Sequence, residues 1–485
     1  MAMELPHIIL IVMDTVSAKR CSLYGHTRST TPGLARVATD AVVYRHCFAP
    51  AAWTLPSHIS LFTGLFPGQH GGNNMNFIYP GEYYTLPEVL KDSGYATMAI
   101  SSNLLISRQT KFNVGFDEFH SMESLYSTDR YYHMRETIKA LKPQIKSDLK
   151  EAGLILQKSW AEKYPFYPVQ HILDRIYRKY WGNINEYSAH ATKRTFQLAK
   201  KLLKKPRNSP VFLFINVMEA HDKYNPPRRF LTAIDREQLK ASSLNKMDAL
   251  DFYFDPPELP YEKELVRRLY EQEVTYLDEV LSDFMHFLGK AGLQDDTLLI
   301  VTADHGESLG EHGIYGHFFG LYNELIHVPL LIKYPRSFGL KGDNRQLVQL
   351  HDLFATLVEV SRAPYPVPPT STSLLDQRRT QAFAEFPDIS IQLGRFLRRL
   401  GTIPRHEFMQ PCRCVIDDDL YKLMEWADGS LALFDLKTDY AEANNLLPQA
   451  RFQGLARALQ QNLRENLGEF QYNDTVEDDS EPVAL

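Results

Sequence analysis

The ten residues 297–306, TLLIVTADHG, decide the fold class of this chain. The first seven form a β-branched and apolar run of the kind found in strands that are buried on both faces. Runs of similar composition recur along the chain, with helical patterns between them, at residues 8–13, 41–44, 95–101, 211–217 and 328–333. Strands that alternate with helices predict an α/β fold, in which a mostly parallel central sheet is sandwiched by helices.

Acidic and imidazole side chains follow several of these runs. They are Asp14, Glu219, His221, Asp304 and His305. In a parallel α/β sheet the carboxyl ends of the strands form one edge, and ligands bind there. Asp14, Asp304 and His305 offer oxygen and nitrogen ligands that suit a hard or borderline divalent cation. The sequence therefore predicts a metal site at that edge.

A short helix is predicted at residues 54–64, TLPSHISLFTG, because Pro56 suits a first helical turn and Gly64 suits a helix end. Thr54 then lies at or beside the N-cap, where free N–H groups favour an anion or an alkoxide. A hydroxyl at this place is either a cap or a nucleophile, and the segment alone favours a cap. A metal beside Thr54 would lower the pKa of the hydroxyl and favour the nucleophile.

Together these segments resemble the sulfatase-type members of the alkaline phosphatase superfamily. The matching motifs cover most of the chain: residues 8–14, Tyr24-Gly25, Thr31-Pro32, residues 54–64, Gly115-Phe116-Asp117, His221, and residues 302–307, 322–331, 352–360, 421–423 and 433–446. The resemblance implies a large catalytic α/β domain and a smaller C-terminal α+β domain that contains a short antiparallel sheet.

Three positions depart from the sulfatase pattern. A sulfatase has Cys, or sometimes Ser, where this chain has Thr54, and that residue is converted to formylglycine. It has Arg at the position of His58 and usually Lys at the position of His317. Thr cannot become formylglycine, so a sulfated Thr54 could not expel sulfate by reforming a carbonyl group. The Thr branch of the superfamily includes phosphodiesterases and phosphoethanolamine and glycerophosphate transferases, because a phosphorylated Thr beside a metal can be hydrolysed or passed to an acceptor.

The resemblance implies roles for individual side chains. One divalent metal would be held by Asp14, Thr54, Asp304 and His305; Mn or Zn suits these ligands better than Ca, which prefers oxygen alone. The expected catalytic residues are Thr54, His58, His221 and His317. The expected substrate-binding residues are Asn73, Asn74 and Asn103. Taken singly, the histidines and asparagines also have a structural interpretation, as buried histidines and turn residues.

The leading functional hypothesis is a metal-dependent hydrolase that cleaves phosphate esters through a phospho-Thr54 intermediate. Phosphodiesters are favoured over monoesters, because the Lys and Arg contacts that a doubly charged phosphate needs are missing. The alternatives are a sulfatase that works without formylglycine, a transferase that moves a phospho-headgroup to a glycan or lipid, and a non-catalytic binding protein. The expected partner is an anionic phosphate-ester or sulfate-ester substrate.

Charge is divided unevenly along the chain. The formal net charge of the 485 residues is −6, whereas residues 135–207 hold 17 Lys+Arg and 6 Asp+Glu, which is +11 and leaves −17 for the rest. We interpret residues 123–207 as a basic helical insertion, which is either a solvated helical unit or a surface for an anionic polymer, substrate or membrane. The overall charge excludes a uniformly basic protein, so nucleic acid is not expected as the main partner.

The domain boundaries follow from local signals. Asp428-Gly429 between two short apolar runs predicts a hairpin, and we expect a catalytic domain at residues 1–370, a smaller domain at 371–470 and an acidic, disordered tail at 471–485. The apolar run at residues 8–13 is too short for a signal-peptide core or a membrane span. The four cysteines are too few for a disulfide scaffold. We therefore expect a soluble, cytoplasmic protein.

Overall fold

The structure, a computed structural model, describes residues 5–72, 83–121, 187–222, 224–245, 257–317, 319–375, 378–386 and 410–469. Asn73 and Asn74 lie outside these residues, as do most of the basic insertion and the acidic tail. The expectations about those parts of the chain therefore stay predictions.

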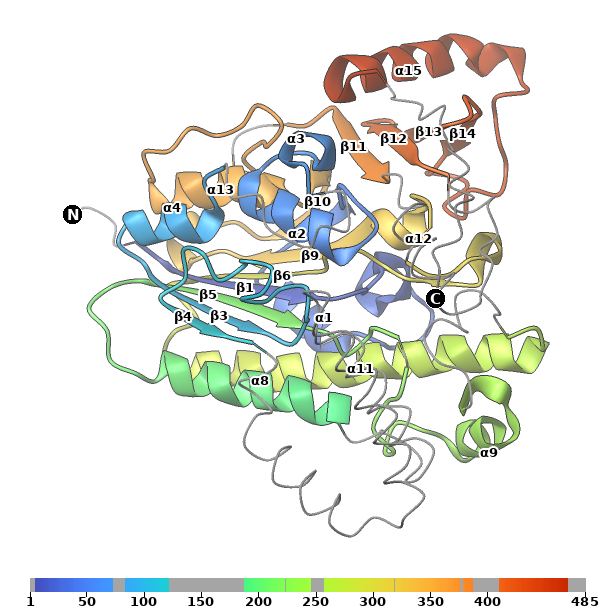
Figure 1. The fold of residues 1–485 in the computed structure, drawn as a ribbon. Helices are drawn as coiled ribbons and strands as arrows, with labels where there is room; N and C mark the ends of the chain where they lie inside the picture. The colour runs from blue at the N-terminus through green and yellow to red at the C-terminus, as the bar shows by residue number, and fades with distance from the viewer. Residues whose placement is uncertain are drawn as a thin grey trace, which may run out of the picture.

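An eight-stranded sheet forms the centre of the molecule, in the order β10-β2-β9-β6-β1-β5-β3-β4 (Figure 1). Its strands are β1 His7–Met13, β2 Val42–Phe48, β3 Ala96–Ser101, β4 Glu118–His120, β5 Val211–Val217, β6 Thr297–Thr302, β9 His327–Lys333 and β10 Gly342–Gln349. Strand β9 runs antiparallel to β2 and β6, and the other adjacent pairs are parallel. The predicted α/β fold with a mostly parallel sheet is confirmed. The edge strands β4 and β10 carried no sequence signal, because β4 is three residues long and β10 begins with exposed polar residues.

The apolar runs form the central strands because both faces of the sheet are covered. Every residue of β5 and β6 is buried, and in β1 only His7 is partly exposed. Each fully buried Val, Leu or Ile side chain contributes about 1.5–3 kcal/mol relative to an exposed one. The burial on both faces thus explains why these strands read as continuous apolar runs and show no alternation.

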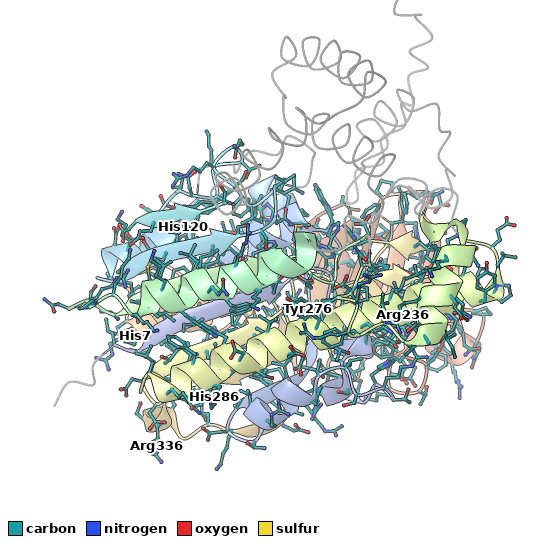
Figure 2. All side chains as sticks on the ribbon, turned by 90° about the horizontal axis from the view of Figure 1, so that it is seen from below. His7, His120, Arg236, Tyr276, His286 and Arg336 are labelled. Atoms are coloured by element: carbon teal, nitrogen blue, oxygen red, sulfur yellow. The ribbon has the colours of Figure 1, made fainter. Side chains whose placement is uncertain are left out.

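Two layers of helices cover the sheet (Figure 1). One layer contains α2 (Thr54–Thr63), α4 (Leu86–Asp92) and α13 (Asp352–Ser361), which pack on one another. The opposite layer contains α1 (Pro32–Ala38), α8 (Tyr187–Leu203) and α11 (Pro260–Lys290); Figure 2 shows α8 and α11 side by side on this face. The shorter elements are α3 Pro67–His70, α9 Ala233–Ala241, α12 Asn323–Ile326, β7 Ser308–Leu309, β8 Tyr315–Gly316 and the 3-10 helices Ala18–Arg20, Ser22–Tyr24, Ser243–Asn245, Glu311–Gly313, Arg336–Phe338 and Ala450–Phe452.

A second, antiparallel sheet follows in the chain. Its strands, in spatial order, are β11 Gln381–Phe386, β12 Cys412–Asp417, β13 Tyr421–Trp426 and β14 Leu431–Asp435. Helix α15 (Gln453–Leu467) packs on β12 and β13 (Figure 1). The predicted hairpin joins β13 to β14, and its turn uses Gly429 at a φ of 82°, which a glycine adopts without strain. Gln349 ties the two sheets together, since its amide donates to Phe383 O at 2.6 Å and accepts from Phe383 N at 3.1 Å.

The four cysteines, at positions 21, 47, 412 and 414, are all buried free thiols. Cys412 and Cys414 lie on β12, where their side chains pack into the apolar cluster between the two sheets. This placement agrees with the expectation that the chain is not held by disulfides. Within the described part of the chain, none of the helices has both the length and the apolar character that crossing a membrane requires.

Candidate active site

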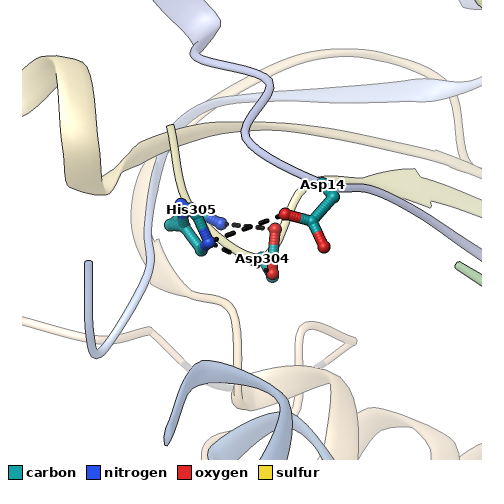
Figure 3. A group of neighbouring side chains, drawn as sticks. All are labelled: Asp14, Asp304 and His305. Carbon is teal, nitrogen blue, oxygen red and sulfur yellow. Dashed lines mark hydrogen bonds and ion pairs between the residues drawn. The ribbon is translucent and has the colours of Figure 1, made fainter. Parts of the chain in front are cut away.

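Asp14, Asp304 and His305 meet at the carboxyl edge of the central sheet (Figure 3). Strands β1 and β6 are adjacent and parallel, with Val12 opposite Thr302, so Asp14 and Asp304 emerge side by side. His305 Nε2 lies 3.7 Å from Asp14 Oδ1 and 3.4 Å from Asp304 Oδ2. One ligand atom from each of the three residues lies within 4.8 Å of the other two, and all three residues are fully buried.

The two carboxylates each use one oxygen and leave the other bare. Asp14 Oδ2 accepts a hydrogen bond from Asn103 Nδ2 at 2.6 Å. Asp304 Oδ1 accepts from the backbone N–H of His305 at 2.9 Å and of Thr15 at 3.4 Å. Asp14 Oδ1 and Asp304 Oδ2 have no hydrogen-bond partner among the described residues. Bare carboxylate oxygens are costly in a buried site, so these residues fit a divalent cation.

Charge and tautomer also suit a cation. Burial, reinforced by the nearby charge of Asp14, raises the pKa of Asp304 well above its usual range. A cation between the two carboxylates would remove this repulsion. Burial lowers the pKa of His305 well below its ordinary value and keeps the ring neutral. His305 Nδ1 lies 2.9 Å from Gly306 O and donates to it, so Nε2 presents a lone pair to the site.

A glycine follows this pair because the backbone of α12 passes close by. Gly306 N donates to Leu325 O at 2.7 Å, which anchors the turn after His305. A Cβ atom on Gly306 would lie 1.9 Å from Glu324 O, so a larger side chain would push the turn and its metal ligands away from α12. The Asp-His-Gly run is thus explained by close backbone packing as well as by its ligands.

Thr54 is the first residue of α2, and Trp53 is the N-cap. The Thr54 hydroxyl is therefore not the cap that its segment alone favoured. Thr54 Oγ1 lies 3.4 Å from His305 Nε2, and only 3% of the residue surface is exposed. The hydroxyl thus lies beside His305 and at the positive end of a helix, where an alkoxide is stabilised.

His58 lies beneath Thr54 and is completely buried. Its Nδ1 atom is 2.9 Å from Thr54 O and 3.3 Å from Asp304 Oδ2. Phe112 and Phe214 meet the His58 ring edge-on, at centroid distances of 6.3 Å and 6.0 Å. Burial lowers the pKa of His58, so the ring is neutral. These contacts place His58 where it supports the backbone of Thr54.

The rings of His221 and His317 meet edge to face, with their centroids 4.8 Å apart. The His317 ring is also 4.6 Å from that of His305. Each ring is held by a carboxylate: His221 Nδ1 lies 2.5 Å from Asp222 Oδ1, and His317 Nδ1 lies 2.9 Å from Glu307 Oε1. Both of these contacts use the Nδ1 atom of the ring.

The two rings have opposite charge preferences. Burial alone would lower the pKa of His221, but the Asp222 carboxylate outweighs it and raises the pKa well above the ordinary value. Burial, together with the positive charge on His221, lowers the pKa of His317 to about 3. His221 thus carries a proton at neutral pH, and His317 is a neutral ring.

Two further residues with sequence signals make contacts that the sequence did not predict. Asn103 donates its amide to Asp14 at 2.6 Å, and its expected contact with a substrate stays a prediction. Glu219, at the end of β5, is buried beside Glu273 of α11 and Thr192 of α8. Burial raises the pKa of Glu219 to about 7. Glu219 therefore belongs to the packing between β5 and these helices, and it does not join the metal ligands.

A second group of possible ligands lies where the main body meets the C-terminal sheet. It consists of His312, Glu324 and Glu442. Glu442 already has partners, because Lys422 Nζ lies 2.6 Å from its Oε1 and Asn323 N donates to its Oε2 at 2.7 Å. Lys422 also donates to Leu321 O at 2.5 Å and is fully buried. This group therefore joins the two parts of the chain through an ion pair.

The sequence did not predict several residues of the candidate site. Asp222 and Glu307 hold the two histidines, and their only signal is that each lies beside a predicted site residue in the sequence. Tyr270 lies in the middle of α11 and bonds to the chain just after Asp14, at Thr15 and Ser17. Nothing in a long helical pattern distinguishes that tyrosine from a core residue.

Comparison with known proteins gives two family matches. The family described as "Sulfatase" matches residues 6–362, and the family described as "N-sulphoglucosamine sulphohydrolase, C-terminal" matches residues 310–469. Among curated proteins, the chain is 22% identical to an N-acetylglucosamine-6-O-sulfatase of Bacteroides thetaiotaomicron, over 99% of the chain and 89% of that protein. It is 30% identical to a multifunctional alkaline phosphatase superfamily protein of Trinickia caryophylli, over 40% of the chain and 38% of that protein.

Solved structures show the same fold. A phosphonate monoester hydrolase of Agrobacterium radiobacter has a TM-score of 0.68 and 18% identity, with 95% of each chain covered. A second structure, solved in complex with its substrate D-glucosamine-2-N,6-O-disulfate, has a TM-score of 0.67 and 19% identity, with 99% of this chain and all of that chain covered. A phosphonate monoester hydrolase and a protein whose substrate is a disulfated glucosamine thus share this fold.

Proposed function

This chain belongs to the sulfatase family of the alkaline phosphatase superfamily, and from that premise we propose that it is a metal-dependent hydrolase of phosphate esters. The proposed enzyme prefers phosphodiesters and acts through a phospho-Thr54 intermediate. The residues proposed to hold the metal are Asp14, Thr54, Asp304 and His305, and those proposed to act on the substrate are Thr54, His221 and His317. His58 is assigned to the catalytic group as the support of Thr54.

The placement of the Thr54 hydroxyl carries this proposal. It lies at the first residue of α2 and 3.4 Å from His305 Nε2, which is itself 3.7 Å from Asp14 Oδ1 and 3.4 Å from Asp304 Oδ2. A divalent cation bound there would lower the pKa of the hydroxyl and withdraw charge from the substrate oxygens. The mixed carboxylate, imidazole and hydroxyl set suits Mn or Zn better than Ca. A threonine also cannot form the aldehyde hydrate on which sulfate release in this family depends.

The chemical steps follow from the positions of Thr54 and His221. Thr54 gives up its hydroxyl proton to solvent, and its Oγ1 atom forms a bond to phosphorus while the bond from phosphorus to the leaving oxygen breaks. The leaving oxygen takes a proton from His221, which Asp222 keeps charged. Water then attacks the phosphorus and passes one proton to His221. The bond between Thr54 Oγ1 and phosphorus breaks, and Oγ1 takes back a proton from solvent.

The preference for diesters rests on the small positive charge of the site. A monoester dianion needs several fixed cations, whereas a diester carries one negative charge. At the position where sulfatases usually have Lys, His317 is a neutral ring held by Glu307. His221 is then the one charged side chain among the proposed catalytic residues, so a singly charged group is matched better.

A substrate panel tests the proposal directly. We expect the purified enzyme, loaded with Mn²⁺ or Zn²⁺, to hydrolyse an aryl phosphodiester with a higher kcat/KM than the matched aryl phosphomonoester, phosphonate monoester or sulfate. The same aryl leaving group in all four substrates makes the comparison one of the transferred group alone. Fastest turnover of the aryl sulfate would contradict the proposal and favour sulfate chemistry.

Replacing His317 should change this preference. We expect His317→Lys to raise the ratio of monoester to diester kcat/KM by about tenfold, because an ammonium group adds one charge-assisted contact to the dianion. His317→Gln is the matched control, since it keeps a neutral donor and should leave the ratio unchanged. Parallel kinetics on the two substrates measure the ratio. If Lys and Gln shift it equally, charge at this position does not select the substrate.

A second candidate function is the hydrolysis of sulfate esters, or the transfer of a phospho-headgroup. Sulfate hydrolysis is favoured by the alignment with an N-acetylglucosamine-6-O-sulfatase over nearly the whole chain and by the similar structure bound to a sulfated glucosamine. It would require a route through Thr54 without formylglycine. Transfer to a glycan or lipid would use the same phospho-Thr54, with the acceptor hydroxyl in place of water, and the basic insertion would then contact an anionic polymer or membrane surface.

A further inference from the structure

The turn after Asp14 contains a strained residue. Six described residues other than glycine have a positive φ, and among them Thr15, at 61°, is the β-branched one. A β-branched residue in this left-handed region is an outlier, because its Cβ substituents crowd the backbone. Such strain persists where surrounding contacts impose it, and it points to a function.

The Thr15 conformation connects the two carboxylates of the proposed metal site. Its N–H group points at Asp304 Oδ1, 3.4 Å away, and its hydroxyl donates to Asp14 O at 2.7 Å. Asp304 Oδ1 is occupied by this contact and by His305 N, which leaves Oδ2 directed at the metal position. If Thr15 relaxed to an ordinary conformation, its N–H would turn away from Asp304, and the chain leaving Asp14 would change direction.

One side chain from the opposite helical layer holds this turn. Tyr270 of α11 is completely buried, and its hydroxyl donates to Thr15 O at 2.7 Å. The same oxygen accepts from Ser17 N at 3.0 Å, so it bridges both sides of the turn. Tyr224 packs edge-on against the Tyr270 ring at a centroid distance of 5.4 Å, which fixes the direction of the hydroxyl.

We propose that Tyr270 is a positioning residue of the metal site: its hydroxyl holds Thr15 in the left-handed conformation and thereby orients Asp14 and Asp304. Tyr270 touches neither the metal position nor the substrate in this scheme, and it acts through the backbone of Thr15. The inference rests on the proposed metal site. Metal affinity would then depend on Tyr270 of α11, which lies 255 residues from Thr15 in the sequence.

Metal affinity tests the proposal without reference to turnover. The quantity to measure is the Kd of the purified full chain for Zn²⁺ and for Mn²⁺, obtained by competition with a chelating indicator. Tyr270→Phe keeps the ring and removes the hydroxyl, and we expect it to weaken metal binding by about 10- to 100-fold, as changes that support metal ligands typically do. Tyr334→Phe is the matched control. Its buried hydroxyl, just after β9, hydrogen-bonds to the hydroxyl of Tyr44 on β2 and not to the proposed metal site.

A double-mutant cycle separates positioning from a general loss of structure. Thr15→Gly allows the left-handed conformation without a Cβ penalty. In that background the hydrogen bond from Tyr270 should therefore contribute less to metal affinity. We expect Tyr270→Phe to weaken metal binding less than threefold when Thr15 is already Gly. An equal effect of Tyr270→Phe in both backgrounds would overturn the proposal, and so would an unchanged Kd in the single variant.

A reference variant distinguishes failure of this inference from failure of the metal site. Asp304→Asn removes a proposed ligand and should abolish binding of the same ions. If Asp304→Asn abolishes binding while Tyr270→Phe leaves the Kd unchanged, the metal site stands and the positioning role is wrong. If Asp304→Asn has no effect on the Kd, the ions bind elsewhere, and both the site and the positioning role are overturned.

Discussion

Thr54→Ala enzyme should lose at least about a thousandfold in kcat on an aryl phosphodiester, while its metal affinity falls much less. Removal of a nucleophile costs more than removal of a supporting contact, because no other group can form the covalent intermediate. In this site Thr54 Oγ1 is the hydroxyl beside His305, and two carboxylates and an imidazole remain to hold a metal after the change. Steady-state kinetics and a metal titration of the same preparation measure both effects.

The helix itself supplies the control for this prediction. Thr63 lies at the other end of α2, is equally buried, and donates its hydroxyl to Ile59 O at 2.7 Å. We expect Thr63→Ala to cost about 1 kcal/mol of stability and to leave turnover unchanged. Rapid acid quench of the wild-type enzyme with substrate, followed by mass spectrometry, should place a phosphoryl group on the peptide that contains Thr54. Full activity of Thr54→Ala, or phosphoryl label on another residue, would rule out this nucleophile.

The meeting of Asp14, Asp304 and His305 could be predicted because it depends on a regular feature of the fold. Parallel neighbouring strands end at one edge, so the residues directly after β1 and β6 must be close whatever the loops do. The register of Val12 against Thr302 brings Asp14 and Asp304 side by side, and His305 follows in the same turn. The sequence pattern was therefore sufficient for the central strands and for the meeting of these three side chains, but not for the edge strands β4 and β10.

The rule that residues after parallel strands lie at one edge of the sheet does not determine the direction of their side chains. Glu219 follows β5 at the same edge, but its carboxylate packs against Glu273 and Thr192 in the opposite helical layer. Asn103 follows β3, and its amide donates to Asp14, a contact that the sequence did not predict. Sequence spacing fixes where the Cα atom of such a residue lies, whereas the rotamer depends on packing with helices far away in sequence.

The exchange of Arg for His at position 58 has a physical explanation in this fold. The His58 ring is closed in by Phe112 and Phe214 and by the backbone of Thr54. A guanidinium group there would need charged partners in a fully buried space. A neutral imidazole meets that space with a hydrogen bond to Thr54 O, so the change at position 58 agrees with the loss of a cation at position 317. Both changes lower the positive charge of the proposed active site relative to the sulfatase pattern.

Asp304→Asn should separate stability from function, because the wild-type site holds two carboxylates that repel each other without a cation. Burial and Asp14 raise the pKa of Asp304 above its value in the unfolded chain. For a carboxyl group this sign means that the metal-free protein loses stability as pH rises from about 4 through the raised folded-state pKa. The metal-free Asn variant should therefore unfold with a free energy higher by on the order of 2 kcal/mol at neutral pH.

The same variant should gain nothing from added metal. Ligand binding stabilises the folded state in proportion to ln(1 + [L]/Kd), so Zn²⁺ or Mn²⁺ should raise the unfolding free energy of the wild type and not that of Asp304→Asn. Turnover should fall at least about a thousandfold.

Asp352→Asn is the control with the opposite sign, because Asp352 is paired with Arg379 and accepts from Gln349 N and Thr372 N at 2.8 Å each. Breaking that buried pair should cost about 3–5 kcal/mol while the response to metal persists, and denaturant unfolding with and without metal measures both variants. A metal-free Asp304→Asn protein less stable than the wild type would mean that the two carboxylates do not repel each other, and the charge argument for a cation at this site would fail with it.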